Sequence, residues 1–276
     1  MAHTLQERYS QLVDIKLRAS LVKKNGIIFN TRYEGNPKAG AVKIPVRDTE
    51  TTVAAYVKTT GAALTHGATT YLTATIDKDY AVNELIDGFD AAAVPDNLVA
   101  DRLDSAGYSL ALQMENDASV CLEAAATAMA GTTALTRSTV YDTIVDARAL
   151  LSNAYVPLEG RFLLVTPDLY TLLLKDTDHF IHATQLGDQV IASGAVGRIA
   201  GFTVYEDPTL VGANAKIDFI AGHPNWCCRV EEWQVPVHVQ DLAGSGTFIG
   251  ASAVQGRKIY CHKVTKAATL LKRVHA

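Results

Sequence analysis

Apolar residues recur at helical spacing near the N-terminus. Thr4 and Glu7 have the spacing of a capping box, which is typical of the start of a helix. The periodic positions that follow are Leu5, Tyr9, Leu12, Ala19 and Val22. The pattern predicts a basic amphipathic arm of about 20 residues, which docks either on its own core or on a neighbouring subunit.

A longer helical pattern occupies residues 95–131. Pro95 suits a first helical turn, and from there to Gly131 there is no proline and one internal glycine, Gly107. The apolar stripe consists of Val99, Leu103, Ala106, Leu110, Met114, Cys121, Ala125 and Ala128. A helix of some 35 residues would span about 50 Å, which is unusually long for a compact domain.

A strand and helix pattern follows. Thr139 and Asp142 open a helix that we expect to run to about Asn153. The stretch 161–165 is typical of a buried strand, and Thr166-Pro167 then begins a helix that reaches Leu174. A further strand is expected over 202–206. This order indicates a mixed α/β unit.

Within residues 41–82, two short stretches alternate between apolar and polar positions with a period of two. Val42, Ile44 and Val46 alternate with polar or proline positions, and a second alternation covers 72–76. The Thr/Ala/Gly-rich stretch 48–70 between them has little to bury by itself. The sequence therefore predicts a long hairpin whose tip becomes ordered against a partner.

The C-terminal residues are rich in strand patterns. Strands are expected at 216–221, 225–232, 235–239 and 253–264, with a Gly/Ser loop at 243–247. Because no helical pattern intervenes, we expect them to pair as a long antiparallel ribbon.

Composition and charge narrow the class of protein. The chain of 276 residues is 48% hydrophobic and 20% charged, and it contains neither a membrane-length apolar run nor a secretory leader pattern. The formal net charge of −4 divides unevenly: residues 1–47 carry +6, residues 251–276 carry +6, and the middle carries −16. If the oppositely charged segments meet across subunit boundaries, assembly would be sensitive to salt.

Candidate metal and nucleotide sites are weak. His223 with Cys227 and Cys228, or Cys261 with His262, invites a zinc interpretation, but the paired C-x₂-C spacing is missing. The spacing of Gly194, Gly197 and Gly201 is not the dinucleotide fingerprint, so we predict turns rather than a nucleotide site. We expect buried reduced thiols, no metal and no cofactor.

The best catalytic candidates are His179 and His182, with Asp176 and Asp178 nearby. They follow a helix end, where polar residues are common, so a solvated loop is the simpler interpretation. No motif of a nucleophilic or metal-dependent enzyme is present, so we predict no catalytic residues and no enzymatic activity. Base-specific recognition of nucleic acid is also unsupported, because residues 77–123 hold eleven acidic and two basic residues.

The order of a basic arm, a long hairpin, a long helix, an α/β unit and a β-ribbon resembles the major capsid protein of tailed bacteriophages, with its Hong Kong 97-type α+β fold. Three local stretches are similar to segments of that family: RFLLVTPDLYTLLL at 161–174, GAVGRIAGFTVYEDP at 194–208 and GRKIYCHKVTKAATLL at 256–271. The resemblance covers essentially the whole chain.

The resemblance implies a domain organisation. The segments are an N-arm at 1–35, an extended loop at 36–85, a peripheral domain with the spine helix at 86–131, an axial domain at 132–222 and peripheral return strands at 223–276. The extended loop would overlap the adjacent subunit.

The resemblance also implies a function and partners. The chain would assemble into hexamers and pentamers of an icosahedral shell that encloses a double-stranded DNA genome, which it contacts sparsely and without specificity. It would be formed in the bacterial cytoplasm and reside in the virion, with portal, scaffolding and decoration proteins as possible partners and no membrane contact. The alternatives are an encapsulin-like bacterial compartment or, less favoured, a soluble α/β enzyme that uses His179 and His182.

One departure from the family prototype concerns cross-linking. The prototype joins a lysine of the extended loop to an asparagine with help from a glutamate. Lys58 could stand for the lysine, but the corresponding loop, about 241–250, contains neither Asn nor Glu. We therefore expect a shell without covalent cross-links.

Overall fold

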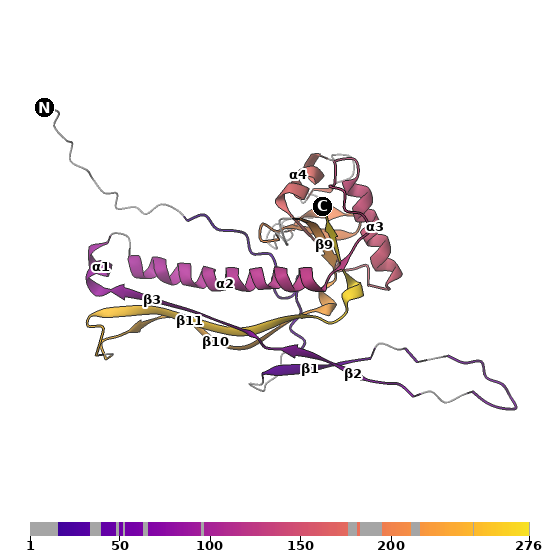
Figure 1. Ribbon diagram of the computed structural model, residues 1–276, viewed down its shortest axis with the longest axis horizontal. Helices are drawn as coiled ribbons and strands as arrows, with labels where there is room; N and C mark the ends of the chain where they lie inside the picture. Colours follow the sequence, from indigo (N-terminus) through magenta and orange to yellow (C-terminus); the bar gives the residue numbers. More distant parts are fainter. Residues whose placement is uncertain are drawn as a thin grey trace.

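The molecule is elongated, with a long helix over a narrow sheet, a compact α/β body at one end and a projecting hairpin (Figure 1). A computed structural model describes residues 16–33, 40–47, 50–51, 53–62, 66–94, 97–175, 181–182, 195–210, 216–244 and 246–275. Within this part of the chain, no helix is long and apolar enough to cross a membrane.

Helix α2 (Leu98–Ala125) is the predicted long helix, but it has 28 residues and a length of about 42 Å. It begins after Asn97, whose side chain accepts a hydrogen bond from the Ala100 amide. The prediction that it continues to Gly131 is wrong. Thr127 and Ala128 instead pair with β12, and this tertiary pairing overrides the helical tendency of the alanines.

The sheet beneath α2 has three antiparallel strands in the order β10-β11-β3. Their bounds are β3 Lys78–Asp87, β10 Cys227–Asp241 and β11 Ala251–Val264. The predicted ribbon of β10 and β11 is confirmed, and the two patterns expected at 225–232 and 235–239 form one strand with two register shifts. A short helix, α1 (Gly88–Ala93), links β3 to α2.

The hairpin consists of β1 (Ala41–Val46) and β2 (Thr70–Thr75), paired in register from Ala41–Thr75 to Val46–Thr70. This confirms the predicted alternation. At its base, Ile44 and Ala74 pack on Val230 and Cys261 of the ribbon. The connecting loop reaches far beyond the rest of the molecule (Figure 1).

The compact body contains a seven-stranded mixed sheet in the order β4-β12-β9-β5-β8-β7-β6. Its strands are β4 Thr127–Ala128, β5 Phe162–Val165, β6 Ile181–His182, β7 Ala195–Ile199, β8 Phe202–Glu206, β9 Ile217–Gly222 and β12 Leu270–Val274. The expectation that the strand at 216–221 belongs to the ribbon is wrong. That strand, β9, lies between β12 and β5, because every one of its residues is buried and needs cover on both faces.

Helices α3 (Val140–Asn153) and α4 (Pro167–Lys175) pack on one face of this sheet. The other face is covered by the C-terminal half of α2, through Ala118 and Leu122, and by Val22, Ile28 and Phe29 of the N-terminal segment. Helices α3 and α4 begin and end within two residues of the predicted positions. The sheet therefore has a core on each face, and the core that it shares with α2 joins the body to the long helix.

The predicted arm differs from expectation in its described part. Residues 16–24 adopt no regular helix and run alongside α2. The backbone amides of Val22 and Lys23 donate to a side chain of α2 rather than to an earlier carbonyl, so external hydrogen bonds replace helical ones. The rest of the predicted helix lies outside the described residues.

Candidate assembly surfaces

The loop at the end of the hairpin exposes large apolar side chains. Val53 is 95% exposed and Tyr56 74% exposed. The tip closes in a turn in which the Val57 and Gly61 amides each donate to the other residue's carbonyl. Gly61 has a φ of +72°, a conformation that favours glycine. This ordered turn carries apolar surface far from any core of its own chain.

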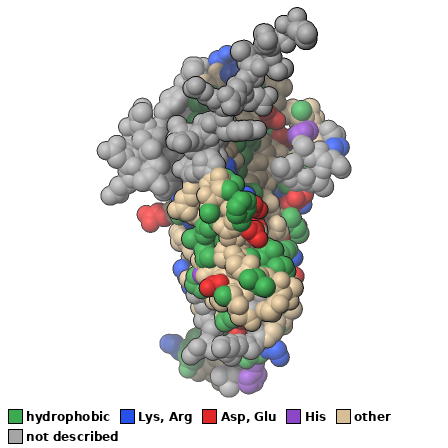
Figure 2. Space-filling model, turned by 90° about the vertical axis from the view of Figure 1, so that its left-hand side faces the viewer, with side chains coloured by type: hydrophobic (Ala, Val, Ile, Leu, Met, Phe, Trp, Pro, Cys, Tyr) green, Lys and Arg blue, Asp and Glu red, His purple; other side chains and the backbone are tan. Residues whose placement is uncertain are grey.

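A second apolar surface lies at the opposite end of α2, and we call it the distal tip. It consists of Leu85, Phe89, Val94, Phe248 and Ile249. Figure 2 shows this end of the molecule, with hydrophobic side chains and acidic groups side by side. α1 and the β10–β11 loop approach so closely that a Cβ on Gly88 would lie 2.2 Å from the Gly250 carbonyl oxygen. Glycine at position 88 is therefore required for this packing.

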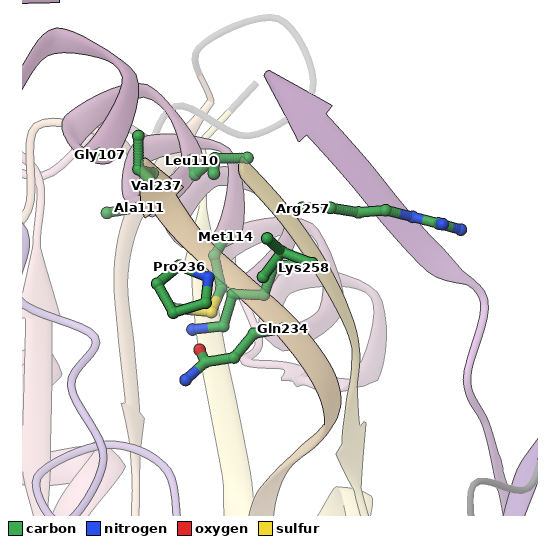
Figure 3. Close-up of a pocket in the computed structure, with 10 residues that line it drawn as sticks. Gly107, Leu110, Ala111, Met114, Gln234, Pro236, Val237, Arg257 and Lys258 are labelled. Carbon is green, nitrogen blue, oxygen red and sulfur yellow. The ribbon is translucent and has the colours of Figure 1, made fainter. Parts of the chain in front are cut away.

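A groove of about 180 Å³ lies between α2 and β10 (Figure 3). Its apolar lining comes from Leu110, Ala111 and Met114 of α2 and from Val235, Pro236 and Val237 of β10. Proline lacks a backbone N–H, and the pairing of β10 with β11 shifts register between Val235 and His238. The irregular stretch of β10 therefore forms one wall of this groove.

The described part of the arm is tied to α2 by ion pairs within one chain. Lys16 lies 2.6 Å from Asp101 and Arg18 lies 2.5 Å from Asp104. The Arg18 guanidinium also lies over the Tyr108 ring. These contacts are partly exposed, so salt will weaken them.

Lys23 continues the arm into a buried ion-pair network. Its side chain is fully buried and its ammonium contacts Asp207 and, at 3.7 Å, Glu115. It also donates a hydrogen bond of 2.7 Å to Thr209 Oγ1. The Val22 and Lys23 amides both donate to Glu115 Oε1. One lysine therefore links the arm, α2 and the turn after β8.

Arg229 of β10 extends this network to the ribbon. Its guanidinium donates to the Lys23 carbonyl and, through Nε, to His262 Nε2 at 2.9 Å. Burial and the positive charge of Arg229 lower the pKa of His262 to about 3. The ring is therefore neutral near pH 7 with its proton on Nδ1, and it serves as an acceptor rather than as a metal ligand.

About half of the eleven acidic residues in the stretch 77–123 form ion pairs within the chain. Its carboxylates at Asp79, Glu84, Asp101, Asp104 and Glu115 all form ion pairs with Lys or Arg. Asp117 accepts a hydrogen bond of 2.8 Å from the Tyr260 hydroxyl. These pairs make the stretch less repulsive to phosphate than its composition indicates.

The cysteines are free thiols. Burial raises the pKa of Cys121 and Cys261 to about 11 and that of Cys228 to about 12, and it raises the pKa of Cys227 as well. Protonated thiols are poor nucleophiles and poor metal ligands. His223 uses both ring nitrogens: Nδ1 accepts from the Asn225 amide and Nε2 donates to the Glu159 carbonyl.

The catalytic candidates are not brought together in the described part of the molecule. Asp176, Asp178 and His179 lie outside the described residues, and only the backbone of His182 is placed, in β6 opposite Gly197. Among the described residues, no set of three His, Cys, Asp or Glu side chains could hold a metal ion. Lys58 is exposed in the hairpin turn.

The compact body has an exposed turn held by a buried arginine. Tyr155 is 94% exposed with a φ of +56°, and Leu158 is 59% exposed. The Arg161 guanidinium is buried beneath them and donates to the Val156 and Pro157 carbonyls. The turn therefore presents an exposed aromatic side chain on a backbone that Arg161 holds in place.

Sequence reasoning did not single out Lys23, Arg229 or Phe89. Lys23 and Arg229 are isolated basic residues, and nothing in a linear pattern shows that they meet. Phe89 had a signal, since an aromatic residue between Asp87 and Asp90, just before the predicted long helix, has no place in an apolar stripe.

We compared the chain with family models, curated proteins and solved structures. A family model described as a phage capsid protein matches residues 89–233. A search among curated proteins finds no match.

Solved structures match nearly the whole chain. A chain of Mycobacterium phage Che8 is 21% identical with a TM-score of 0.78, covering 98% of this chain and 96% of that one. The capsid of the cyanophage P-SCSP1u is 14% identical with a TM-score of 0.70, covering 98% and 93%. The capsid of a native GTA particle is 13% identical with a TM-score of 0.66, covering 99% and 95%. These matches confirm the predicted α+β, Hong Kong 97-like fold.

Proposed function

This chain belongs to the phage capsid protein family, and we propose that it is the major capsid protein of a tailed phage with a double-stranded DNA genome. In this function it assembles into hexamers and pentamers of an icosahedral shell, without covalent cross-links. The family match over residues 89–233 is the observation that carries the proposal. A structural role in the virion follows, and we propose no enzymatic activity.

The shape of the subunit supports assembly. The hairpin tip and the distal tip lie at opposite ends of the molecule, and both expose large apolar side chains. Exposed apolar surface of this kind marks sites of protein association. A shell buries it by repeating each contact between copies, so many weak contacts together become stable.

We also propose partners for the shell. The hairpin overlaps an adjacent subunit, and packaged DNA touches the wall sparsely and without base specificity. Portal, scaffolding and decoration proteins join the particle, and assembly takes place in the cytoplasm of the bacterial host. The domain boundaries at residues 35, 85, 131 and 222 likewise remain predictions.

Size-exclusion chromatography followed by negative-stain electron microscopy tests the proposed function. We expect the expressed chain to elute as large particles that appear as closed shells. A variant with Val53 and Tyr56 both changed to Asp should elute as small species with an unchanged circular dichroism spectrum, because both residues are exposed. Wild-type chains that remain monomers or dimers would contradict the proposal.

The contents of the particles separate the phage shell from a bacterial compartment of the same fold. Particles purified from infected cells should contain double-stranded DNA protected from nuclease. Particles that instead carry a bound cargo enzyme and no DNA would favour the encapsulin-like alternative.

A further inference from the structure

We propose that the groove between α2 and β10 receives the Phe89 side chain of a second copy of this chain. This contact rests on the proposed self-assembly of the chain, in which two different surfaces of neighbouring copies meet. It assigns the groove and the distal tip to one interface, with a donor side chain and an acceptor groove on every subunit.

The groove has the size and lining that a phenyl ring requires. Its volume is about 180 Å³, and an apolar protein cavity of about 150 Å³ accommodates benzene. Leu110, Ala111 and Val237 provide aliphatic walls, and Met114 provides a sulfur that packs well against aromatic rings. A Cβ on Gly107 would meet no atom within 4 Å, so the helix leaves open space at this edge of the groove.

Phe89 is presented for insertion rather than folded back on its own chain. Its side chain is 80% exposed. Its amide donates a 2.8 Å hydrogen bond to Asp87 Oδ1, which fixes the start of α1. A side chain on a fixed backbone loses little conformational freedom when it binds, which favours its use as an anchor.

The chain cannot fill its own groove. Gly107 lies nine residues beyond Leu98, where α2 begins, which corresponds to about 14 Å along the helix axis. Phe89 precedes that beginning, at the far end of the helix, and its side chain is shorter than this distance. The ring must therefore come from another copy.

Charge favours Phe89 over the exposed side chains of Tyr56 and Ile249. Arg257 and Lys258 line the groove, and no acidic residue does, although the Arg257 guanidinium points away from the other lining side chains (Figure 3). Lys258 already holds one carboxylate, that of Glu231, yet an ammonium group has further donors. Asp87 and Asp90 flank Phe89 and can accept from the Lys258 ammonium.

The competing donors lack this complementarity. Tyr56, in the hairpin, lies two residues before Lys58, which would face the like charge of Lys258 at the groove. Ile249 lies between Phe248 and Gly250 and has no adjacent charge. The contact we propose is heterologous, because the distal tip and the groove are different surfaces, and such contacts generate closed rings when the rotation between copies closes.

Photo-cross-linking in assembled particles tests the contact directly. A benzophenone amino acid replaces Phe89 in one tenth of the subunits, so that wild-type chains maintain assembly. After irradiation, mass spectrometry should place the cross-links on Met114 or Leu110 of another chain. The same probe at position 155, exposed on the compact body, serves as the control and should not reach the groove.

The outcomes separate this inference from the proposed function. Intact particles whose cross-links from position 89 fall on the hairpin, on α1 or on the compact body would overturn the inference and leave the function standing. Wild-type chains that form no particles would overturn both.

A double-variant cycle gives a second, independent measurement. Phe89→Ala should raise the lowest protein concentration that supports assembly by about tenfold or more, because a phenyl ring loses its burial. Ala111→Phe, which fills the groove, should have a comparable effect, and the two changes together should be far less than additive. Phe89→Leu should restore part of the loss. Additive effects of the two changes would contradict the contact.

Discussion

Lys23 shows how a single residue unites distant parts of this fold. Its ammonium is fully buried between carboxylates from α2 and from the turn after β8. A buried pair is costly to break, because the remaining partner keeps its desolvation penalty without its counter-charge. The arm therefore contributes to the stability of each subunit and not to assembly alone.

Lys23→Ala should lower the free energy of unfolding of unassembled subunits by about 3–5 kcal/mol, because Glu115 and Asp207 would remain buried without the cation. Urea denaturation at pH 7 measures the change. The matched control is Lys16→Ala, which removes a pair whose side chains are 33% and 35% exposed and should cost at most about 1 kcal/mol. Equal effects of the two variants would contradict the buried network.

His262 predicts a pH dependence of subunit stability. Its pKa in the folded chain is about 3, below the usual value near 6.5, so the unfolded chain binds the additional proton between these limits. Stability is therefore complete above about pH 6.5 and falls as the pH is lowered through this window, by about 2 kcal/mol at pH 5.

His262→Gln tests this dependence, because glutamine keeps an acceptor for Arg229 and does not titrate. Thermal unfolding of unassembled subunits between pH 5 and pH 7 should show a shallower loss of stability for this variant. His66→Gln, at an exposed position of the hairpin, should leave the slope unchanged. If the wild type and H262Q had the same slope, another group would be responsible.

At the scale of elements, local signals predicted some boundaries well. The strand, cap and helix at 161–175 follow from a buried apolar run, Thr166 and Pro167, and the Thr166 hydroxyl accepts from the Leu169 amide. Here periodicity and caps agree, so no distant residue is needed to define the element. The hairpin strands were predictable for the same reason.

Other elements depend on partners that are distant in the sequence. α2 ends early because Thr127 and Ala128 pair with β12, which lies about 140 residues further along the chain. Residues 16–24 lose their helical pattern because Glu115 and Asp101 on α2 offer stronger partners. Single-sequence patterns contain no information on such pairings.

The arm is held by partly exposed ion pairs at Lys16 and Arg18 and by the buried side chain of Lys23, so salt should release its outer part first. Trypsin should cut after Lys16 and Arg18 faster as ionic strength rises, because the pairs with Asp101 and Asp104 are partly exposed and screened. Cleavage after Lys23 should stay slow at every salt concentration, since its side chain is buried. Mass spectrometry of the early fragments measures both rates.

If cleavage in the outer arm and cleavage after Lys23 had the same salt dependence, the arm would be released as one unit, contrary to this prediction. An Asp101→Lys, Asp104→Lys variant provides the control: its outer arm should be cut rapidly even at low salt, whereas the site after Lys23 should remain protected.

At the scale of the whole molecule, the basic ends and the acidic middle of the chain are partly paired with each other within one subunit. The sequence predicted salt-sensitive assembly if the basic ends met the acidic middle across subunit boundaries. Within one chain, four acidic residues of 77–123 already pair with basic residues of the two ends. The order of elements made the architecture predictable, because a long hairpin, a long helix, an α/β unit and a returning ribbon follow in the order that the capsid family shows. The groove and its proposed ligand were not predictable, since the bulge at Pro236 appears only when the strands pair.

We expect the whole particle to lack covalent cross-links. Lys58 is exposed in the hairpin turn, but residues 241–250 offer neither an asparagine to accept its amine nor a glutamate to assist. Shells boiled in SDS should therefore run as a single band near the chain mass of 29.6 kDa. Lys58→Ala particles should give the same band. A ladder of covalent multimers that disappears in K58A would show that Lys58 reacts with another acceptor. Covalent bonds would then contribute to the stability of the particle.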